Sequence, residues 1–358
     1  MKTDALEGPR SRVDGLTAYE RAPVPDGVVL RLDANEGTPI GIETVLRALR
    51  EGAGEVLRRY SDKRPLEAIL ARRFSVQKQQ VFVGAGADDV IDRCCRAFLA
   101  PNRSLLIAEP GFEMFDQYAS LCGARVRKAW WSRGPYPIAR MLELVDDETA
   151  VIALVTPNNP TGETATLDDL TALAAAAPGA LIILDHAYVE FGDADFTADA
   201  LDLPNVVVVR TFSKAWGLAG CRVGYAIGPA RITAALRAAG GPFPVSAASL
   251  AIVQAVVEDG WSSREAYVSQ IRAERRELLE LLARRQASPR PSEANFVFAE
   301  LGDTAPAVHA ALVARGILVR LIAKQDRTPL GLRIALPGDP IAFELLSRSM
   351  DAALQEVA

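Results

Sequence analysis

One lysine, Lys214, has the surroundings that covalent chemistry on a carbonyl compound needs. It follows the run 205–209, whose β-branched residues predict a buried strand, so it lies just past the end of that strand. Open α/β sheets bind ligands at the carboxyl ends of their strands. A lysine held there loses its proton more easily than in water and can form a Schiff base. Thr211, Ser213 and Arg222 around it suit a phosphate. The phosphorylated aldehyde that enzymes hold through a lysine is pyridoxal 5′-phosphate (PLP).

Two further strand ends carry groups that suit this cofactor. Asp185 directly follows the apolar run 181–184, and a buried carboxylate is costly unless it is paired. The pyridinium nitrogen of PLP is such a partner, and a facing carboxylate keeps that nitrogen protonated. The segment 81–90 predicts a strand, a glycine turn and the start of a helix, where backbone N–H groups bind anions. An isolated Ser-Lys pair is usually a solvated surface pair, and it is this context that favours a functional interpretation.

The elements that must position these groups alternate along the chain. Spacing of the strands as βαβ units predicts a mainly parallel sheet, to which the run 223–227 adds a further strand. A long charged helix over about 263–286 then leads to strands and helices on a shorter scale, which predict a compact α+β unit. Its charged residues are expected on a solvated face: Arg272, Glu274, Arg275, Arg276 and Glu277. Other predicted strands cover 28–33, 104–108, 150–155, 295–298, 317–320 and 331–336, and predicted helices cover 42–52, about 65–74, 230–240 and the C-terminus.

The string from Arg210 to Tyr225, RTFSKAWGLAGCRVGY, resembles the lysine signature of the fold-type I, class I/II PLP-dependent aminotransferases. The loop 156–162, TPNNPTG, is also typical of these enzymes, and the chain is most similar to their histidinol-phosphate aminotransferase branch. This resemblance spans about residues 19–333. It implies a large PLP-binding domain over 41–270, an N-terminal arm and first part of a small domain over 1–40, and a C-terminal small domain over 271–358.

The resemblance also implies roles for individual residues around PLP. Lys214 would hold the cofactor as a Schiff base and, once displaced, would move the proton during transamination. Asp185 would face the ring nitrogen, while Tyr188 and Asn159 would bond the phenolate oxygen. Phe112 would stack on the pyridine ring, an aromatic contact worth about 1 kcal/mol. Ala87, Asp88, Thr211, Ser213 and Arg222 would hold the phosphate, joined by Tyr60 from the other subunit of a homodimer.

The substrate is less closely specified. Tyr19, Asn35, Arg320 and Arg333 fit the histidinol-phosphate pattern, with the two arginines holding a phosphate or a carboxylate. The family usually continues its Asn-Glu pair with Asn-Pro, where this chain has Gly37 and Thr38, and it commonly has an acid at His186. We expect His186 to be near the site or on the surface, without a catalytic role. A specialised aminotransferase for another amino acid stays open, as does a threonine-phosphate decarboxylase-like enzyme.

Two hypotheses from other protein classes have weaker support in the sequence. Gly84 and Gly86 match the first two glycines of a dinucleotide fingerprint and Glu109 is placed like a ribose-binding acid, but Asp89 stands at the third glycine position. This partial match is weak support for an NAD-dependent dehydrogenase. A non-catalytic PLP-binding regulator would need a DNA-binding module, and no helix-turn-helix pattern precedes the enzyme-like region.

Composition favours a globular enzyme. The 358 residues are 49% hydrophobic with a formal charge of −5, which is ample for a large core and does not suit a nucleic-acid partner. There is no apolar run of membrane-spanning length and no secretion signal, so we expect a cytoplasmic protein with small-molecule partners, an amino donor and a 2-oxo acid. The four cysteines and two histidines show no zinc spacing, and we expect buried, unpaired cysteines.

Overall fold

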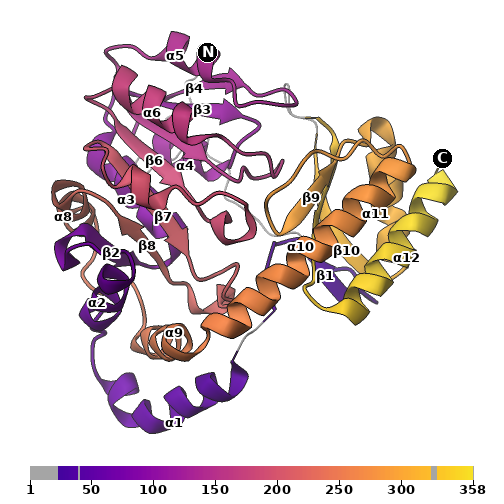
Figure 1. The fold of residues 1–358 in the computed structure, drawn as a ribbon, viewed down its shortest axis with the longest axis horizontal. Helices are drawn as coiled ribbons and strands as arrows, with labels where there is room; N and C mark the ends of the chain where they lie inside the picture. The colour runs from indigo at the N-terminus through magenta and orange to yellow at the C-terminus, as the bar shows by residue number, and fades with distance from the viewer. Residues whose placement is uncertain (1–22, 39–40, 324–328, 358) are drawn as a thin grey trace, which may run out of the picture.

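The computed structural model describes residues 23–38, 41–323 and 329–357, which form two β-sheets linked by a long helix (Figure 1). The larger sheet occupies the left of Figure 1 and the smaller sheet the right. The strands are β1 (Leu30–Leu32), β2 (Val81–Gly84), β3 (Ser104–Glu109), β4 (Arg125–Trp130), β5 (Thr149–Val155), β6 (Leu181–Asp185), β7 (Val206–Thr211), β8 (Gly224–Ile227), β9 (Phe296–Ala299), β10 (Ile317–Ile322) and β11 (Gly331–Ala335).

The larger sheet has seven strands in the order β2-β8-β7-β6-β5-β3-β4. Only β8 runs antiparallel to its neighbours, so the fold is the mainly parallel α/β class that the sequence predicted. Side chains alternate along the strands, so that Leu105 and Leu106 enter different hydrophobic clusters on opposite faces. Burial of both faces explains why these strands read as continuous apolar runs.

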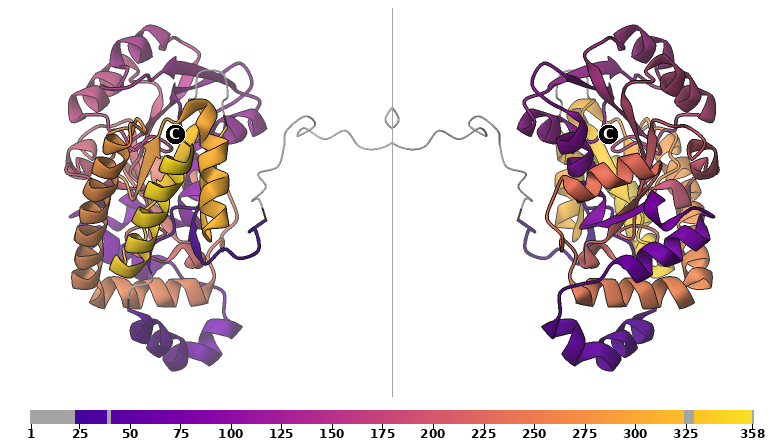
Figure 2. Two further views of the ribbon diagram at one scale, coloured as in Figure 1. Left: turned by 90° about the vertical axis from the view of Figure 1, so that its right-hand side faces the viewer. Right: turned by 90° about the vertical axis from the view of Figure 1, so that its left-hand side faces the viewer.

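Helices cover both faces of this sheet. One face packs on α3 (Gly86–Phe98), α4 (Met114–Leu121) and α8 (Ala230–Ala238), and the other on α5 (Ile138–Leu144), α6 (Leu167–Ala176) and α7 (Thr197–Ala200). In Figure 2, α1 (Ile42–Arg58) lies at the bottom of the molecule, beneath α9 (Ala247–Asp259), on which it packs. The remaining helices are α2 (Arg64–Arg73), α10 (Trp261–Arg284), α11 (Ala305–Ala314) and α12 (Pro340–Val357), with short 3₁₀ turns η1 (Lys78–Gln80), η2 (Val189–Phe191), η3 (Ala219–Cys221) and η4 (Gly302–Thr304).

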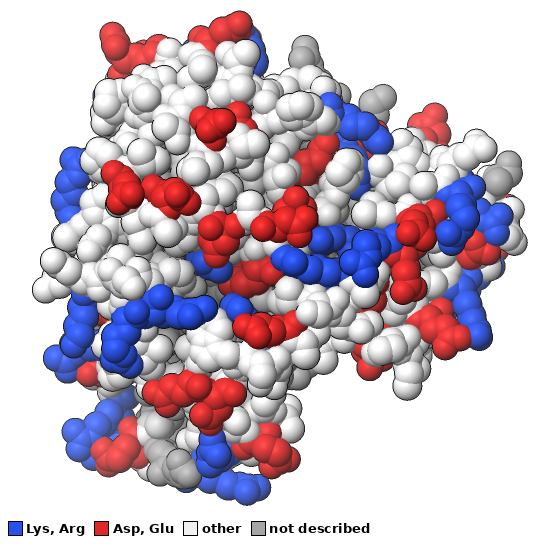
Figure 3. Space-filling model, in the orientation of Figure 1, with Lys and Arg blue, Asp and Glu red and all other residues white. Residues whose placement is uncertain are grey.

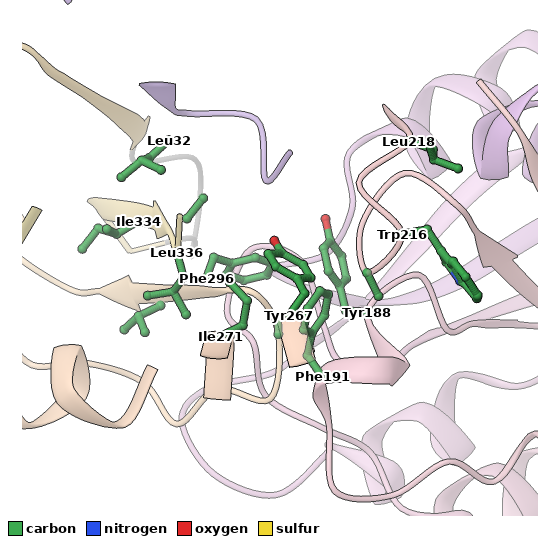
Figure 4. Close-up of a cluster of buried hydrophobic side chains, with 14 of the residues drawn as sticks. Leu32, Tyr188, Phe191, Trp216, Leu218, Tyr267, Ile271, Phe296, Ile334 and Leu336 are labelled. Carbon is green, nitrogen blue, oxygen red and sulfur yellow. The ribbon is translucent and has the colours of Figure 1, made fainter. Parts of the chain in front are cut away.

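The smaller sheet has the order β1-β10-β11-β9 and joins the N-terminal strand β1, in parallel, to C-terminal strands. A hydrophobic cluster runs from this sheet to the large one (Figure 4). In it Leu32 and Ile334 of the small sheet, Ile271 of α10 and Trp216 from the loop after β7 belong to one core. The predicted boundary between residues 270 and 271 falls inside α10, and the division of the chain into domains stays a prediction.

Several local predictions need correction. Helix α1 continues to Arg58, well beyond the predicted end at Gly52. Strand β4 and helices α4 and α5 were not predicted; in Arg125–Trp130 charged and apolar residues alternate and most are only partly buried, so this strand has no apolar run. On α10, Glu274 and Arg275 are buried and not solvated: the Arg275 guanidinium donates to the main-chain oxygens of Phe191 and Ala294, which bind this helix to the site-bearing segment.

Candidate active site

The carboxyl-terminal edge of the large sheet holds a cavity of about 180 Å³. Strands β5, β6 and β7 end there, and α3 begins there, as parallel βαβ topology requires. The cavity brings together twelve of the fifteen predicted site residues: Asn35, Ala87, Asp88, Phe112, Asn159, Asp185, Tyr188, Thr211, Ser213, Lys214, Arg222 and Arg333.

Lys214 is held in this cavity by the chain that enters from β1. Its Nζ donates to the main-chain oxygen of Ala34 at 3.3 Å and lies 5.7 Å from the centre of the Tyr188 ring. Burial, with the positive charge of Arg333, lowers the pKa of Lys214 to about 8. A substantial fraction of the amine is therefore neutral near neutral pH and able to attack a carbonyl carbon.

Asp185, the last residue of β6, is buried in the same cavity. It accepts a hydrogen bond from the Ala187 N–H at 3.0 Å, yet burial raises its pKa to about 7. A carboxyl group with a pKa near 7 is partly protonated at neutral pH, which indicates that it lacks a strong cationic partner among the described residues. A protonated ring nitrogen is the kind of group that would pair with it.

Polar side chains between the two sheets are fixed in orientation by one another. The Tyr188 hydroxyl accepts from Asn35 Nδ2 at 3.1 Å. Arg333 of β11 donates to Asn159 Oδ1 at 2.7 Å and to the main-chain oxygen of Asp33 at 2.8 Å. Because the amide oxygen of Asn159 is thereby engaged, its NH₂ group is left as the donor. Tyr188 and Asn159 thus present O–H and N–H donors on one side of the cavity.

The other end of the cavity is built for an anion. Thr211 Oγ1 and Ser213 Oγ lie 3.0 Å apart, and Arg222 reaches Asp88 Oδ2 at 3.0 Å. Gly86 has φ +89°, a left-handed backbone conformation that favours glycine, and its Cα faces the guanidinium of Arg222. Hydroxyls, a guanidinium and the N-terminal N–H groups of α3 converge as a phosphate site does.

A second cavity, of about 460 Å³, adjoins the first and shares Asp88, Phe112, Asn159 and Arg333 with it. It is lined from the small sheet by Arg320 of β10, which pairs in register with Arg333 of β11. Lys128 of β4 lies on the opposite wall, in ion pairs with Glu109 at 3.1 Å and Asp116 at 2.9 Å. This outer cavity therefore has charged walls from both sheets.

Comparison with known proteins identifies the family. The family model for aminotransferase class I and II matches residues 29–340. The chain belongs to the class I and II aminotransferases. It is 32% identical over 336 residues to histidinol-phosphate aminotransferase 2 of Pseudomonas fluorescens, covering 89% of this chain and 88% of that relative.

Solved structures have the same fold. The histidinol-phosphate aminotransferase of Sinorhizobium meliloti, crystallised with pyridoxal 5′-phosphate, superposes with a TM-score of 0.87 at 24% identity, covering 99% of this chain and all of that one. The L-threonine-O-3-phosphate decarboxylase of Porphyromonas gingivalis superposes with a TM-score of 0.76 at 21% identity, covering 91% and 100%. At these identities the likeness concerns the fold, which is that of the fold-type I PLP enzymes, as the resemblance implied.

Pyridoxal 5′-phosphate is the cofactor of this aminotransferase, as predicted. The residues present fit it: an amine of lowered pKa, a buried carboxyl group of raised pKa and an anion site lie in one cavity. The dehydrogenase hypothesis is wrong. Asp89, at the third glycine position of that fingerprint, instead accepts hydrogen bonds from the Ala85 N–H and from Arg93.

Three predicted site residues lie outside the inner cavity. Arg320 lines the outer cavity. Tyr60 is 82% exposed and stacks on Phe243 with 4.6 Å between ring centres, so within one chain it does not reach the phosphate end. Tyr19 lies outside the described residues.

His186 is neither near the surface nor solvated, although its predecessor Asp185 lines the cavity. It is 1% exposed, packs edge-on against Phe196, and its Nδ1 lies 3.3 Å from Thr197 Oγ1. Burial and the charge of Arg210 lower the pKa of His186 to about 3, so it is neutral. His186 therefore adds no positive charge next to Asp185.

Sequence reasoning missed some of the lining residues. Ala34 contributes a main-chain oxygen, for which side-chain type gives no signal. Lys128 lies on the unpredicted strand β4, and Tyr118 and Asp116 lie on the unpredicted α4. A polar strand at the sheet's edge was the signal that could have located Lys128.

Other predicted absences concern membranes and metals. Across residues 23–38, 41–323 and 329–357, no helix has the length and apolarity to cross a bilayer. The described part of the chain has no cluster of three or more metal-ligating side chains. Cys94 and Cys95 are buried, as expected, whereas Cys122 and Cys221 are only partly buried. Acidic and basic side chains are interspersed on the face in Figure 3.

Proposed function

We propose that this aminotransferase moves the amino group of histidinol phosphate, or of a very similar phosphorylated amine, to a 2-oxo acid. The observation that carries this proposal is the cross-strand pair of Arg320 and Arg333 on the outer cavity, next to the cavity of Lys214. Paired guanidinium groups suit a phosphate through bidentate hydrogen bonds. The curated relatives named histidinol-phosphate aminotransferases, at 30–35% identity, support the same substrate.

Lys214 is the residue that bonds the cofactor in this proposal. Bound PLP supplies an aldehyde and an electron-withdrawing ring. Lys214 would hold that aldehyde through its neutral amine, which a pKa of about 8 makes accessible. When it is not bonded to the cofactor, its Nζ would hold and move a proton beside the reacting carbon.

The other cavity residues orient the cofactor and stabilise charge. Asp185 would accept the ring N–H, and that positive partner would lower its pKa, so the carboxylate would be ionised in the filled site. Tyr188 and Asn159 would donate to the phenolate oxygen from their fixed positions. Phe112 would pack on the ring. The Ala87 and Asp88 N–H groups, with Thr211, Ser213 and Arg222, would hold the phosphate.

A homodimer completes the site. Tyr60 is exposed, far from the phosphate end of its own cavity, and is available to a second subunit. The partner subunit would then supply a hydroxyl to the phosphate. A cytoplasmic location and the domain division at residues 40 and 270 belong to the same proposal.

A different substrate is favoured by one feature of the β1 loop. Gly37, which follows Asn35 and Glu36, packs so closely on the main-chain oxygen of Lys214 that a Cβ would overlap it. The resembled family usually has asparagine there, so the chain differs beside the substrate-facing Asn35. A specialised amino-acid aminotransferase or a threonine-phosphate decarboxylase-like enzyme is the second candidate.

The half-reaction separates these candidates. L-Histidinol phosphate, added to the PLP-loaded enzyme without any oxo acid, should abolish the visible band of the cofactor and leave the amine form. If the visible band did not change with histidinol phosphate but changed with another amino acid, that amino acid would be the substrate. Carbon dioxide release from threonine phosphate would support the decarboxylase.

A further inference from the structure

A third cavity, of about 250 Å³, lies behind the segments that form the active site. Side chains alternate between the two sites: Thr211 and Ser213 line the inner active-site cavity, whereas Arg210 and Phe212 line this rear cavity. Tyr188 likewise faces the active site, while the next residue lines the rear cavity. Figure 4 shows the indole of Trp216, another rear-cavity residue, pointing away from Tyr188.

The acidic side chains of the rear cavity already have cationic partners. Arg210 is buried and donates to Glu190 at 3.0 Å and to Asp195 at 2.9 Å. Asp193 lies 3.6 Å from a guanidinium nitrogen of Arg272. Arg210 and Arg272 thus form the direct ion pairs of these carboxylates, and Glu190 also lies close enough for its charge to act on Arg264.

Two arginines of the rear cavity have no carboxylate partner within the described chain. Arg264 stacks on Trp261 at 4.5 Å and on Trp216 at 5.1 Å, and Arg73 stacks on Trp261 at 4.3 Å. The Nε of Arg264 is buried without a hydrogen-bond acceptor among the described residues, and so is the Nε of Arg210. Buried charged donors without acceptors are costly, so an acceptor placed at these two Nε atoms would be stabilised.

The walls determine what kind of anion fits. Ile69, Leu70, Phe74 and Val257 supply apolar surface beside the two indoles. The volume is below the roughly 300–1,000 Å³ of drug-sized ligand pockets, so the ligand must be small. A bare phosphate would leave the apolar walls in contact with a hydrated ion. A carboxylate on a short aromatic or branched body satisfies both the arginines and the walls.

We propose that the rear cavity is a binding site, separate from the active site, for a small organic monocarboxylate. Its carboxylate bonds the guanidinium of Arg264, with Arg73 at the mouth, and its apolar body packs on Phe74 and Trp216. Amino acids and 2-oxo acids with apolar side chains, which an aminotransferase meets in any case, carry this chemistry.

Benzoate is a suitable probe, titrated calorimetrically into the PLP-loaded enzyme. We expect saturable binding that quenches tryptophan fluorescence. Arg264→Gln should weaken it about tenfold or more, the loss of a charged hydrogen-bond pair. Arg284→Gln, an exposed arginine on the same helix, is the matched control and should bind as the wild type does. Arg333→Gln, which disables the anion site of the active-site cavities, should retain benzoate binding.

The proposal would be overturned if benzoate showed no saturable binding, or if Arg264→Gln left its binding unchanged. It would also be overturned if Arg333→Gln abolished binding and Arg264→Gln did not, because benzoate would then bind only in the active site. Inorganic phosphate should not displace benzoate, and equal displacement would refute the carboxylate assignment. If Arg264→Gln fails to fold, Arg73→Gln at the exposed mouth replaces it, with an expected loss of several-fold and an unchanged affinity as the contrary result.

Discussion

The inner and outer cavities of the active site hold their charged groups in different ways. In the inner cavity Lys214 and Asp185 are buried, and burial moves both pKa values toward neutrality. In the outer cavity Lys128 is part-exposed and paired with acids at 2.9 and 3.1 Å. The inner site is therefore organised to make groups reactive, and the outer site to recognise charge. Substitutions in the inner cavity should affect turnover, and those in the outer cavity should affect substrate affinity.

The largest effect is expected at Lys214. Lys214→Ala should lower turnover by at least a thousandfold, because both the attacking amine and the proton carrier are lost. Single-turnover kinetics with a fixed amino donor measures this. Lys63→Ala, which removes a lysine outside both active-site cavities, is the control. If Lys214→Ala retained full turnover, the inner cavity would not be the place where the reaction occurs.

A smaller but still large effect is expected at Asp185. Asp185→Asn should reduce turnover by a hundredfold or more, since a neutral amide does not keep the ring nitrogen protonated.

Asp185→Asn should also stabilise the cofactor-free protein at pH 8. The folded-state pKa of about 7 lies above the ordinary value of 3.8, so the stability from this group is present below pH 3.8 and lost as pH rises through 7. Denaturant unfolding of the wild type and the variant at pH 5 and pH 8 gives the difference between their free energies of unfolding at each pH. If that difference were the same at both pH values, burial would not have raised the pKa of Asp185.

In the outer cavity, Arg320→Gln should raise KM for histidinol phosphate by about ten- to a hundredfold, with a much smaller change in kcat. It would remove one of the proposed charge-assisted contacts to the substrate phosphate. Arg333→Gln should lower kcat as well, because Arg333 also holds Asn159 at 2.7 Å. If both variants changed KM and kcat by the same factors, the outer cavity would not be specialised for substrate recognition.

The last expected effect concerns the pH dependence of stability and not turnover. Lys214 has a folded-state pKa of about 8, below its ordinary 10.5, so the unfolded chain binds more protons between these values. The free energy of unfolding of the cofactor-free protein should rise from pH 8 to 10.5, by on the order of 3 kcal/mol relative to Lys214→Met. Parallel pH profiles of the two proteins would mean that Lys214 is solvated.

The inner cavity was largely predictable and the outer one was not, for a physical reason. Several inner-cavity residues lie at or just past the end of a buried apolar strand, as Asp185 does after Leu181–Leu184, and a parallel sheet gathers such strand ends at one edge. The outer cavity depends on β4 and α4, whose half-exposed residues give no apolar pattern, and on a contact between two sheets. The burial of His186, Glu274 and Arg275 likewise depends on tertiary packing that no local pattern encodes.

The most direct test of the central claim is to locate the bond between protein and cofactor. The PLP-loaded enzyme is reduced with borohydride and digested, and the masses of its peptides are measured by mass spectrometry. We expect the cofactor on Lys214, in a peptide that Lys214→Ala no longer yields. A cofactor attached to Lys63 or Lys128, or no attachment at all, would contradict the account of the active site.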